Sequence, residues 1–239
     1  VDIAGLVEGA STGEGLGNQF LSNIRETDAI IHVVRAFEND DIVHVSGKVS
    51  PIDDIEIINT ELILSDLSIV EKLYQKAQKN TKSGQKEGMP MKELVEKILT
   101  ALKEGTSLRK LTFGKEELVL LKNFQLLTLK PVLYVANVNE SGFENNPHLD
   151  LILDYATQDH SKVVPICAEI EAEICELSND EKKEFLLEMG QNESGLDRLI
   201  KAGYDLLGLH TYFTAGEKEV KAWTITVGDS APVAAGKIH

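Results

Sequence analysis

The first residues of the chain place an aspartate and a glycine at a spacing that suits phosphate chemistry. An apolar stretch around Asp2 is followed by Gly5, in the run Val1-Asp2-Ile3-Ala4-Gly5. A carboxylate at the end of a strand can hold Mg²⁺, usually through water, and a glycine lets its backbone N–H approach a phosphate oxygen. This D-x-x-G pattern predicts that Asp2 contacts a nucleotide-bound Mg²⁺ through water and that Gly5 contacts the γ-phosphate.

A glycine-rich segment follows this pattern directly, between Glu8 and Asn18. Its glycines allow the backbone to change conformation at low cost, as a switch requires. The residue after Gly5 is Leu6, where many small GTPases have a glutamine that orients the attacking water. Because leucine cannot hydrogen-bond to water, we assign no catalytic residue and expect slow intrinsic turnover.

A second polar cluster, Asn137-Val138-Asn139-Glu140, follows a β-branched run. Guanine-specific proteins carry N-K-x-D at this place, where the aspartate accepts two hydrogen bonds from guanine. Glu140 is one methylene longer, which displaces its carboxylate from the bidentate position. Val138 replaces the lysine, and the Asn137 amide can bond either purine. We therefore predict a base pocket with a weakened guanine preference that also admits adenine.

The third cluster, Cys167-Ala168-Glu169, occupies the place of an S-A-K loop, whose backbone N–H groups contact the base. We expect Cys167 and Ala168 to lie behind the base. The three clusters follow the order found in switch NTPases. The G-x-x-x-x-G-K-[ST] phosphate-binding loop, or P-loop, does not occur in these 239 residues. We expect a piece of a longer protein that alone binds ATP weakly or not at all, because each missing charge-assisted bond contributes roughly 1.5–3 kcal/mol.

Composition limits the remaining possibilities. The net charge of −15 argues against general nucleic-acid binding, DNA included. No apolar run approaches the roughly 18–20 residues that cross a bilayer. The two cysteines do not form a disulfide framework, so we expect reduced thiols in a cytoplasmic protein.

Short β-branched runs at residues 29–34, 131–137 and 162–167 predict buried strands separated by helices, which indicates an α/β fold with a parallel sheet. Between the first two runs, apolar residues spaced 4-3-4-3 predict an antiparallel helical hairpin with a coiled-coil-like seam. The seam comprises Ile63, Leu67, Val70, Tyr74 and Ala77, then Met91, Val95, Ile98 and Leu102. Lysines near its tip form either a solvated face or a partner-binding surface; they are Lys72, Lys76, Lys79, Lys82 and Lys86.

The glycine pattern after Gly5 resembles the Obg-like branch of P-loop NTPases, and longer strings narrow the resemblance. These strings are Asn23–Glu26, Asp28–Ile30, His32–Val45, Asp54–Leu64, Asn137–Glu140 and Tyr212–Val220. Together they resemble the YchF family, the Obg-like ATPases, over essentially the whole chain.

This resemblance implies an incomplete Ras-like P-loop NTPase G domain at residues 1–62 and 129–208. It also implies a helical coiled-coil insertion at residues 63–128 and the start of a β-grasp TGS domain at residues 209–239. The alternating run Glu219–Thr226 agrees with a strand of such a β-rich domain.

In function, the resemblance implies a slow ATPase that uses Mg²⁺ and associates with the ribosome, through the large subunit and possibly RNA, with no membrane or DNA partner. Asp2 and Gly5 would then form the Mg²⁺ and γ-phosphate switch. Asn137, Val138 and Glu140 would border the base, with Cys167 and Ala168 behind it. Two alternatives stay open: an Obg-type GTPase, and a ribosome- or RNA-binding regulatory protein whose hydrolysis is incidental.

Overall fold

A computed structural model describes residue 9 and residues 16–42, 44, 47–82 and 89–238. Its centre is a parallel sheet in the order β1-β2-β3, formed by β1 (Ile30–Arg35), β2 (Val132–Asn137) and β3 (Lys162–Ile166). Ile30 is paired with Val132, and Leu133 with Lys162. The three predicted strands and their parallel α/β arrangement are confirmed.

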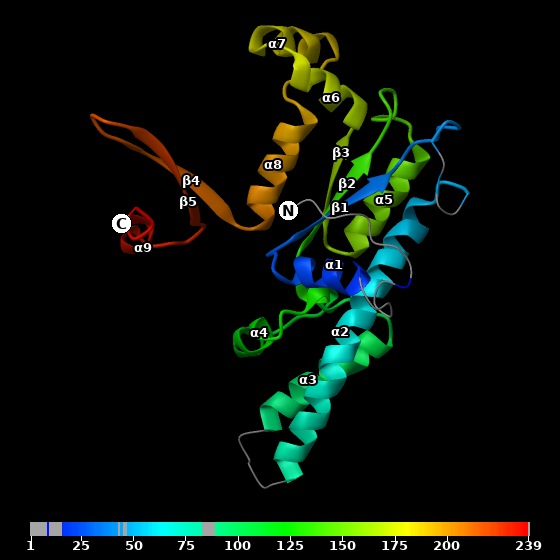
Figure 1. The fold of residues 1–239 in the computed structure, drawn as a ribbon, viewed down its shortest axis with the longest axis vertical. Helices are drawn as coiled ribbons and strands as arrows, with labels where there is room; N and C mark the ends of the chain where they lie inside the picture. The colour runs from blue at the N-terminus through cyan, green and yellow to red at the C-terminus, as the bar shows by residue number, and fades with distance from the viewer. Residues whose placement is uncertain (1–8, 10–15, 43, 45–46, 83–88, 239) are drawn as a thin grey trace.

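Helices cover both faces of this sheet (Figure 1). On one face, α5 (Pro147–Gln158) and α6 (Ala168–Glu176) pack around the fully buried Tyr134, and α7 (Asn179–Glu188) adds Leu186 to the same core. On the other face, α8 (Gly195–Leu206) packs Leu199, Ala202 and Leu206 against β2 and β3.

The face beneath α8 is covered only over part of its width in the described part of the chain. Ile31 and Val33 of β1 are opposite Leu133 and Val135, so their side chains lie on the α8 face. They are nevertheless 49% and 63% exposed. α8 itself presents further exposed apolar side chains, namely Leu196, Ile200 and Tyr204, and Leu207 follows directly after the helix. Parallel sheets are normally covered on both faces, so this apolar surface is suited to contact with another strand or helix.

A long helix, α2 (Pro51–Lys82), connects the sheet with a helical projection (Figure 1). It begins with proline and has Asp53 and Asp54 in its first turn, as helix N-termini favour. It then pairs with α3 (Met89–Lys103), which runs in the opposite direction. The boundary expected between residues 62 and 63 therefore falls inside one continuous helix.

The apolar seam predicted between the two helices packs into one cluster. Val70, Val95, Ile98 and Leu102 are buried in it, with Leu67, Tyr74 and Met91 at its edge. The coiled-coil supercoil and the domain limits stay predictions.

The chain returns from the projection through η2 (Leu108–Lys110), α4 (Lys115–Lys122) and η3 (Leu127–Leu129). The buried Asp66 of α2 accepts hydrogen bonds from the backbone N–H groups of Leu127 and Thr128, at 3.0 and 2.7 Å. The short helix α1 (Leu16–Arg25) packs Leu21 and Ile24 against Leu62 and Leu127 at the same place.

A buried ionic network joins this return segment to the sheet. The fully buried Asp159 carboxylate accepts from Arg109 Nε at 3.0 Å and from the Tyr134 hydroxyl at 2.9 Å. Arg109 Nη2 also donates to Asn59 Oδ1 of α2 at 2.8 Å, and Asn59 donates to the Tyr155 hydroxyl. Removing one member of a buried ion pair typically costs about 3–5 kcal/mol, so this contact holds the projection on the sheet.

The last part of the described chain is an antiparallel hairpin of β4 (Leu209–Ala215) and β5 (Val220–Thr226), followed by α9 (Ala231–Ala235). The predicted strand is confirmed as β5. On one face of the hairpin, the half-buried Trp223 donates to Thr214 Oγ1 at 2.9 Å. On the opposite face, Phe213 of β4 is 72% exposed. Cys167 and Cys175 are both free thiols. Among the described helices, none has the length and apolarity to span a bilayer.

The half-buried His32 of β1 makes folding stability depend on pH. Burial, helped by the nearby Arg109 guanidinium, lowers the pKa of His32 from 6.5 to about 4. The unfolded chain therefore takes up a proton that the folded chain refuses, and stability present above about pH 6.5 is lost as pH falls toward 4. We predict that His32→Gln reduces the loss of unfolding free energy between pH 7 and pH 5 by about 1–2 kcal/mol, measured by urea denaturation.

The exposed His210 on β4 provides the control, because the same replacement there should leave the pH dependence unchanged. Equal pH dependence of wild-type and His32→Gln chains would contradict the prediction.

Candidate base-binding site

The ends of β2 and β3 bring two of the predicted base-binding segments together. The Val138 N–H donates to the Ile166 carbonyl at 2.9 Å, which continues the pairing of the two strands. Next to this bond, the Ala168 N–H donates to Asn137 Oδ1, the side chain of the last residue of β2, at 3.1 Å. The Asn137 side chain therefore bridges the two loops that were predicted to surround a base.

The predicted site residues differ in exposure. Val138 and Cys167 are buried, with 1% and 2% of their surface exposed. Asn137 is half-buried, while Glu140 and Ala168 are exposed. Val138 and Cys167 thus pack in the interior beneath the site. The groups accessible to a ligand come from the half-buried Asn137 and from the exposed Glu140 and Ala168.

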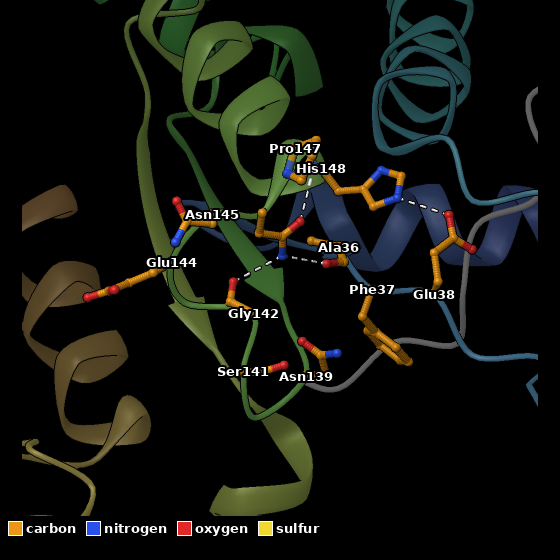
Figure 2. A pocket seen from close by; sticks show the side chains of 11 residues that line it. Ala36, Phe37, Glu38, Asn139, Ser141, Gly142, Glu144, Asn145, Pro147 and His148 are labelled. Carbon is orange, nitrogen blue, oxygen red and sulfur yellow. Dashed lines mark hydrogen bonds and ion pairs between the residues drawn. The ribbon is translucent and has the colours of Figure 1, made fainter.

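A hollow of about 320 Å³ lies beside this bridge, between the end of β1 and the loop that precedes α5 (Figure 2). Its walls are mostly polar, with two glutamates, three asparagines and a histidine, and the Phe37 ring adds an apolar part. The lining residues are Ala36, Phe37, Glu38, Asn139, Ser141, Gly142, Glu144, Asn145, Asn146, Pro147 and His148.

Asn146 organises the walls of this hollow. Its Oδ1 accepts from the N–H groups of His148 and Leu149 and so caps α5, while its Nδ2 donates to the carbonyls of Ala36 and Gly142 at 2.8 and 3.0 Å (Figure 2). A Cβ at Gly142 would overlap the side chain of Asn139. A larger residue there would require the Asn139 side chain to move, so glycine fits the loop as it is folded.

Arg35, the last residue of β1, shapes the opposite wall. Its guanidinium donates to the carbonyls of Phe37, Asn39 and Ile42 at 3.0–3.1 Å and lies 4.7 Å from the centre of the Phe37 ring. The His148 Nε2 and Glu38 Oε1 atoms are 3.0 Å apart across the hollow. These contacts connect the β1 wall to α5.

The helix α6, which begins at Ala168, is fixed on its far side by its own Glu171. Its carboxylate accepts from the N–H groups of Gly195 and Leu196 at 2.6 and 3.1 Å, at the N-terminus of α8. A carboxylate at this place stabilises the helix dipole. The start of α6 is thus bonded to Asn137 through Ala168 and to α8 through Glu171.

Three predicted site residues, Asp2, Gly5 and Leu6, lie outside the described residues. The structure adds residues that sequence reasoning did not select, above all Phe37, Gly142 and Asn146. For Asn146 a local pattern was available, since asparagine followed by proline marks a helix start. For Phe37 and Gly142 the position becomes evident only when the two strand ends are side by side.

Comparison with known proteins shows the family of the chain. A Haemophilus influenzae protein named "Ribosome-binding ATPase YchF" is 59% identical over 239 residues, which cover all of this chain and 66% of the relative. A Mycoplasma pneumoniae protein of the same name is 43% identical over 244 residues, and the chain covers 67% of it. The chain belongs to the YchF family.

A solved structure and a family model support the same assignment. The structure titled "Structure of the Schizosaccharomyces pombe YchF GTPase" superimposes with a TM-score of 0.83 at 35% identity, over 95% of this chain and 63% of that one. The model YchF-GTPase_C, described as "Protein of unknown function (DUF933)", matches residues 209–239. This YchF chain spans about 66% of the length of its bacterial relatives.

The bridge between the two loops predicts the effect of Asn137→Ala. Losing this acceptor removes one hydrogen bond, so we expect the unfolding free energy to fall by about 1 kcal/mol and the Ala168 amide to exchange about tenfold faster. Amide exchange followed by NMR, with urea denaturation, measures both. The exposed Asn139 offers a control, since Asn139→Ala should leave the Ala168 amide unchanged. An unaltered Ala168 amide in Asn137→Ala would refute the bridging role.

Proposed function

We propose that the protein carrying this chain is an ATP-hydrolysing switch protein that associates with the ribosome. The observation that carries the proposal is the hydrogen bond from Ala168 to Asn137, because it assembles two base-binding loops at the carboxyl edge of a parallel sheet. The names of the bacterial relatives agree with both halves of the proposal.

In this proposal each predicted residue has one role. Asn137 and the Val138 backbone border the base, Glu140 reaches its edge, and Cys167 and Ala168 lie behind it. Asp2 would hold Mg²⁺ through water and Gly5 would approach the γ-phosphate. Bound Mg²⁺ supplies charge neutralisation at the phosphates during transfer. Leu6 cannot orient water, which is consistent with slow turnover.

The phosphate cradle belongs, in this proposal, to a part of the longer protein outside these 239 residues. Two observations support it. The sequence contains no P-loop motif, and Ile31 and Val33 leave the β1 side of the sheet exposed beside α8. A strand and helix carrying the phosphate-binding loop would cover this apolar surface and place phosphates near the carboxyl ends of the strands.

The choice of base separates this proposal from an Obg-type GTPase. The fission-yeast relative is titled a GTPase, while the bacterial relatives are named ATPases. Glu140 is exposed on the loop after β2, where a guanine-specific protein has the shorter aspartate. Its extra methylene disfavours the coplanar pair of hydrogen bonds that selects guanine. We therefore propose ATP as the preferred substrate.

Calorimetry on the full-length protein tests the choice of base. We predict that wild-type protein binds ATP more tightly than GTP, and that combining Val138→Lys with Glu140→Asp shifts the ratio toward GTP by about tenfold or more. The exposed Glu144 lies on the same loop, and Glu144→Asp there should not move the ratio. A clear GTP preference in the wild-type protein would overturn the assignment of ATP.

For ribosome association we propose the helical projection as one contact surface, together with the expected TGS domain. Lys72, Lys76 and Lys79 are exposed on α2, and cations on a projecting helix suit contact with RNA phosphates. The large subunit and its RNA are the partners proposed here. If ribosome binding through this surface is the main function, ATP hydrolysis is incidental. Mutations can then abolish ribosome binding without affecting hydrolysis.

Replacing Lys72, Lys76 and Lys79 with glutamate tests this surface. We predict a loss of ribosome co-sedimentation of about tenfold or more in 100 mM salt, because each cation lost removes a phosphate contact, while ATPase activity is retained. Replacing the exposed Lys115, Lys122 and Lys183 gives the same change in net charge at other places and should have little effect. Unchanged co-sedimentation of the first variant would show that its lysines are a solvated face.

A further inference from the structure

Glu61 places a carboxyl group in the interior, within hydrogen-bonding distance of Gly9. It lies on α2, only 4% of its surface is exposed, and its Oε1 accepts a hydrogen bond from the Gly9 backbone N–H at 2.6 Å. Gly9 follows the D-x-x-G pattern by four residues and has φ of +85°, a left-handed conformation that favours glycine. Glu61, which is 52 positions away in sequence, thus bonds the backbone of Gly9.

The helix α1, which follows the glycine-rich segment in sequence, bonds to the same helix through its last residue. Arg25, at the end of α1, donates from Nη2 to Ser65 Oγ at 2.6 Å and lies 3.5 Å from the buried Asp66 Oδ1. Glu61 and Ser65 are four residues apart, so they lie on one side of α2, one turn from each other. Gly9 and α1 are therefore both bonded to adjacent turns of a single helix.

We infer that Glu61 is a positioning residue for the switch segment and that α2 directly connects this segment to the helical projection. The inference rests on the proposed switch function. A backbone N–H bonded to a carboxylate makes a charge-assisted hydrogen bond, about twice as strong as a neutral one. Because α2 is continuous from Pro51 to Lys82, one helix runs without interruption from the projection to Glu61.

This geometry assigns Glu61 an effect on turnover rather than on nucleotide affinity. Glu61 bonds the segment beyond Gly5, whereas the described base-binding residues lie on the loops after β2 and β3. Loosening Gly9 changes how often the switch segment adopts its productive conformation, and leaves the base pocket as it is. The expected signature is a lower kcat at nearly unchanged KM.

Amide exchange of the 239-residue chain tests the positioning role without any nucleotide. In Glu61→Ala, exchange of the Gly9 amide should rise about tenfold, and in Glu61→Gln, which keeps an acceptor but loses the charge, about threefold. The exposed Glu56 on the same helix provides the control, and Glu56→Gln should leave Gly9 unchanged. An unchanged Gly9 rate in a folded Glu61→Ala chain overturns the inference. If that variant fails to fold, a wild-type rate in Glu61→Gln overturns it instead.

Steady-state ATPase measurements on the full-length protein test the consequence. Glu61→Ala is expected to reduce kcat about tenfold with KM within twofold of wild type, and Glu61→Gln is expected to recover most of the rate. Equal losses in both variants, or a change confined to KM, would contradict a positioning role. A wild-type protein without ATPase activity would refute the proposed function, whereas the Gly9 exchange rates would still decide the contact itself.

Discussion

The Asp159 carboxylate is enclosed where the sheet meets the helical projection, and it must be compensated there because a buried charge is costly. Arg109, Lys110 and Tyr134 surround it from the return segment and from β2. Through Asn59, the same network reaches α2. The projection and the strand that ends in the base-binding loop are therefore fixed to one charge, and the placement of each depends on the other.

From this junction the structure leads to its functional edge in two directions. β2 continues from Tyr134 for three residues to Asn137, whose side chain accepts the Ala168 N–H and so joins the loops after β2 and β3. α2 leads from Asn59 to Glu61 two residues later, which holds Gly9. Asn137 and Gly9 are thus both linked to the junction around Asp159, although more than a hundred residues separate them in sequence.

Local patterns allowed the sheet to be predicted, because β-branched runs are dominated by the need for burial. The seam of α2 and α3 was accessible for the same reason. The start of α2 could not be predicted in this way. Ile52 and Ile55 in its first turns pack against the sheet and do not belong to the 4-3-4-3 spacing of the seam. Glu61 becomes important only through its bond with the distant Gly9. Phe37 and Gly142 contact near neighbours in sequence, and they line one hollow because the ends of β1 and β2 lie side by side. Asp2, Gly5 and Leu6 lie outside the described residues, and their roles stay predictions.

The separation of β1 from its neighbour β2 has a consequence for how the chain folds. Residues 36–131 lie between the two strands, and closing a flexible loop costs more entropy as it lengthens, by about 0.6 kcal/mol for each doubling. The contacts of α2 with α3 are local in sequence and form without this cost. Once they have formed, Lys103 at the end of α3 lies beside Glu71 in the middle of α2. The loop that pairing of β1 with β2 must still close is then effectively shorter, so the projection lowers the entropic cost of joining the two strands.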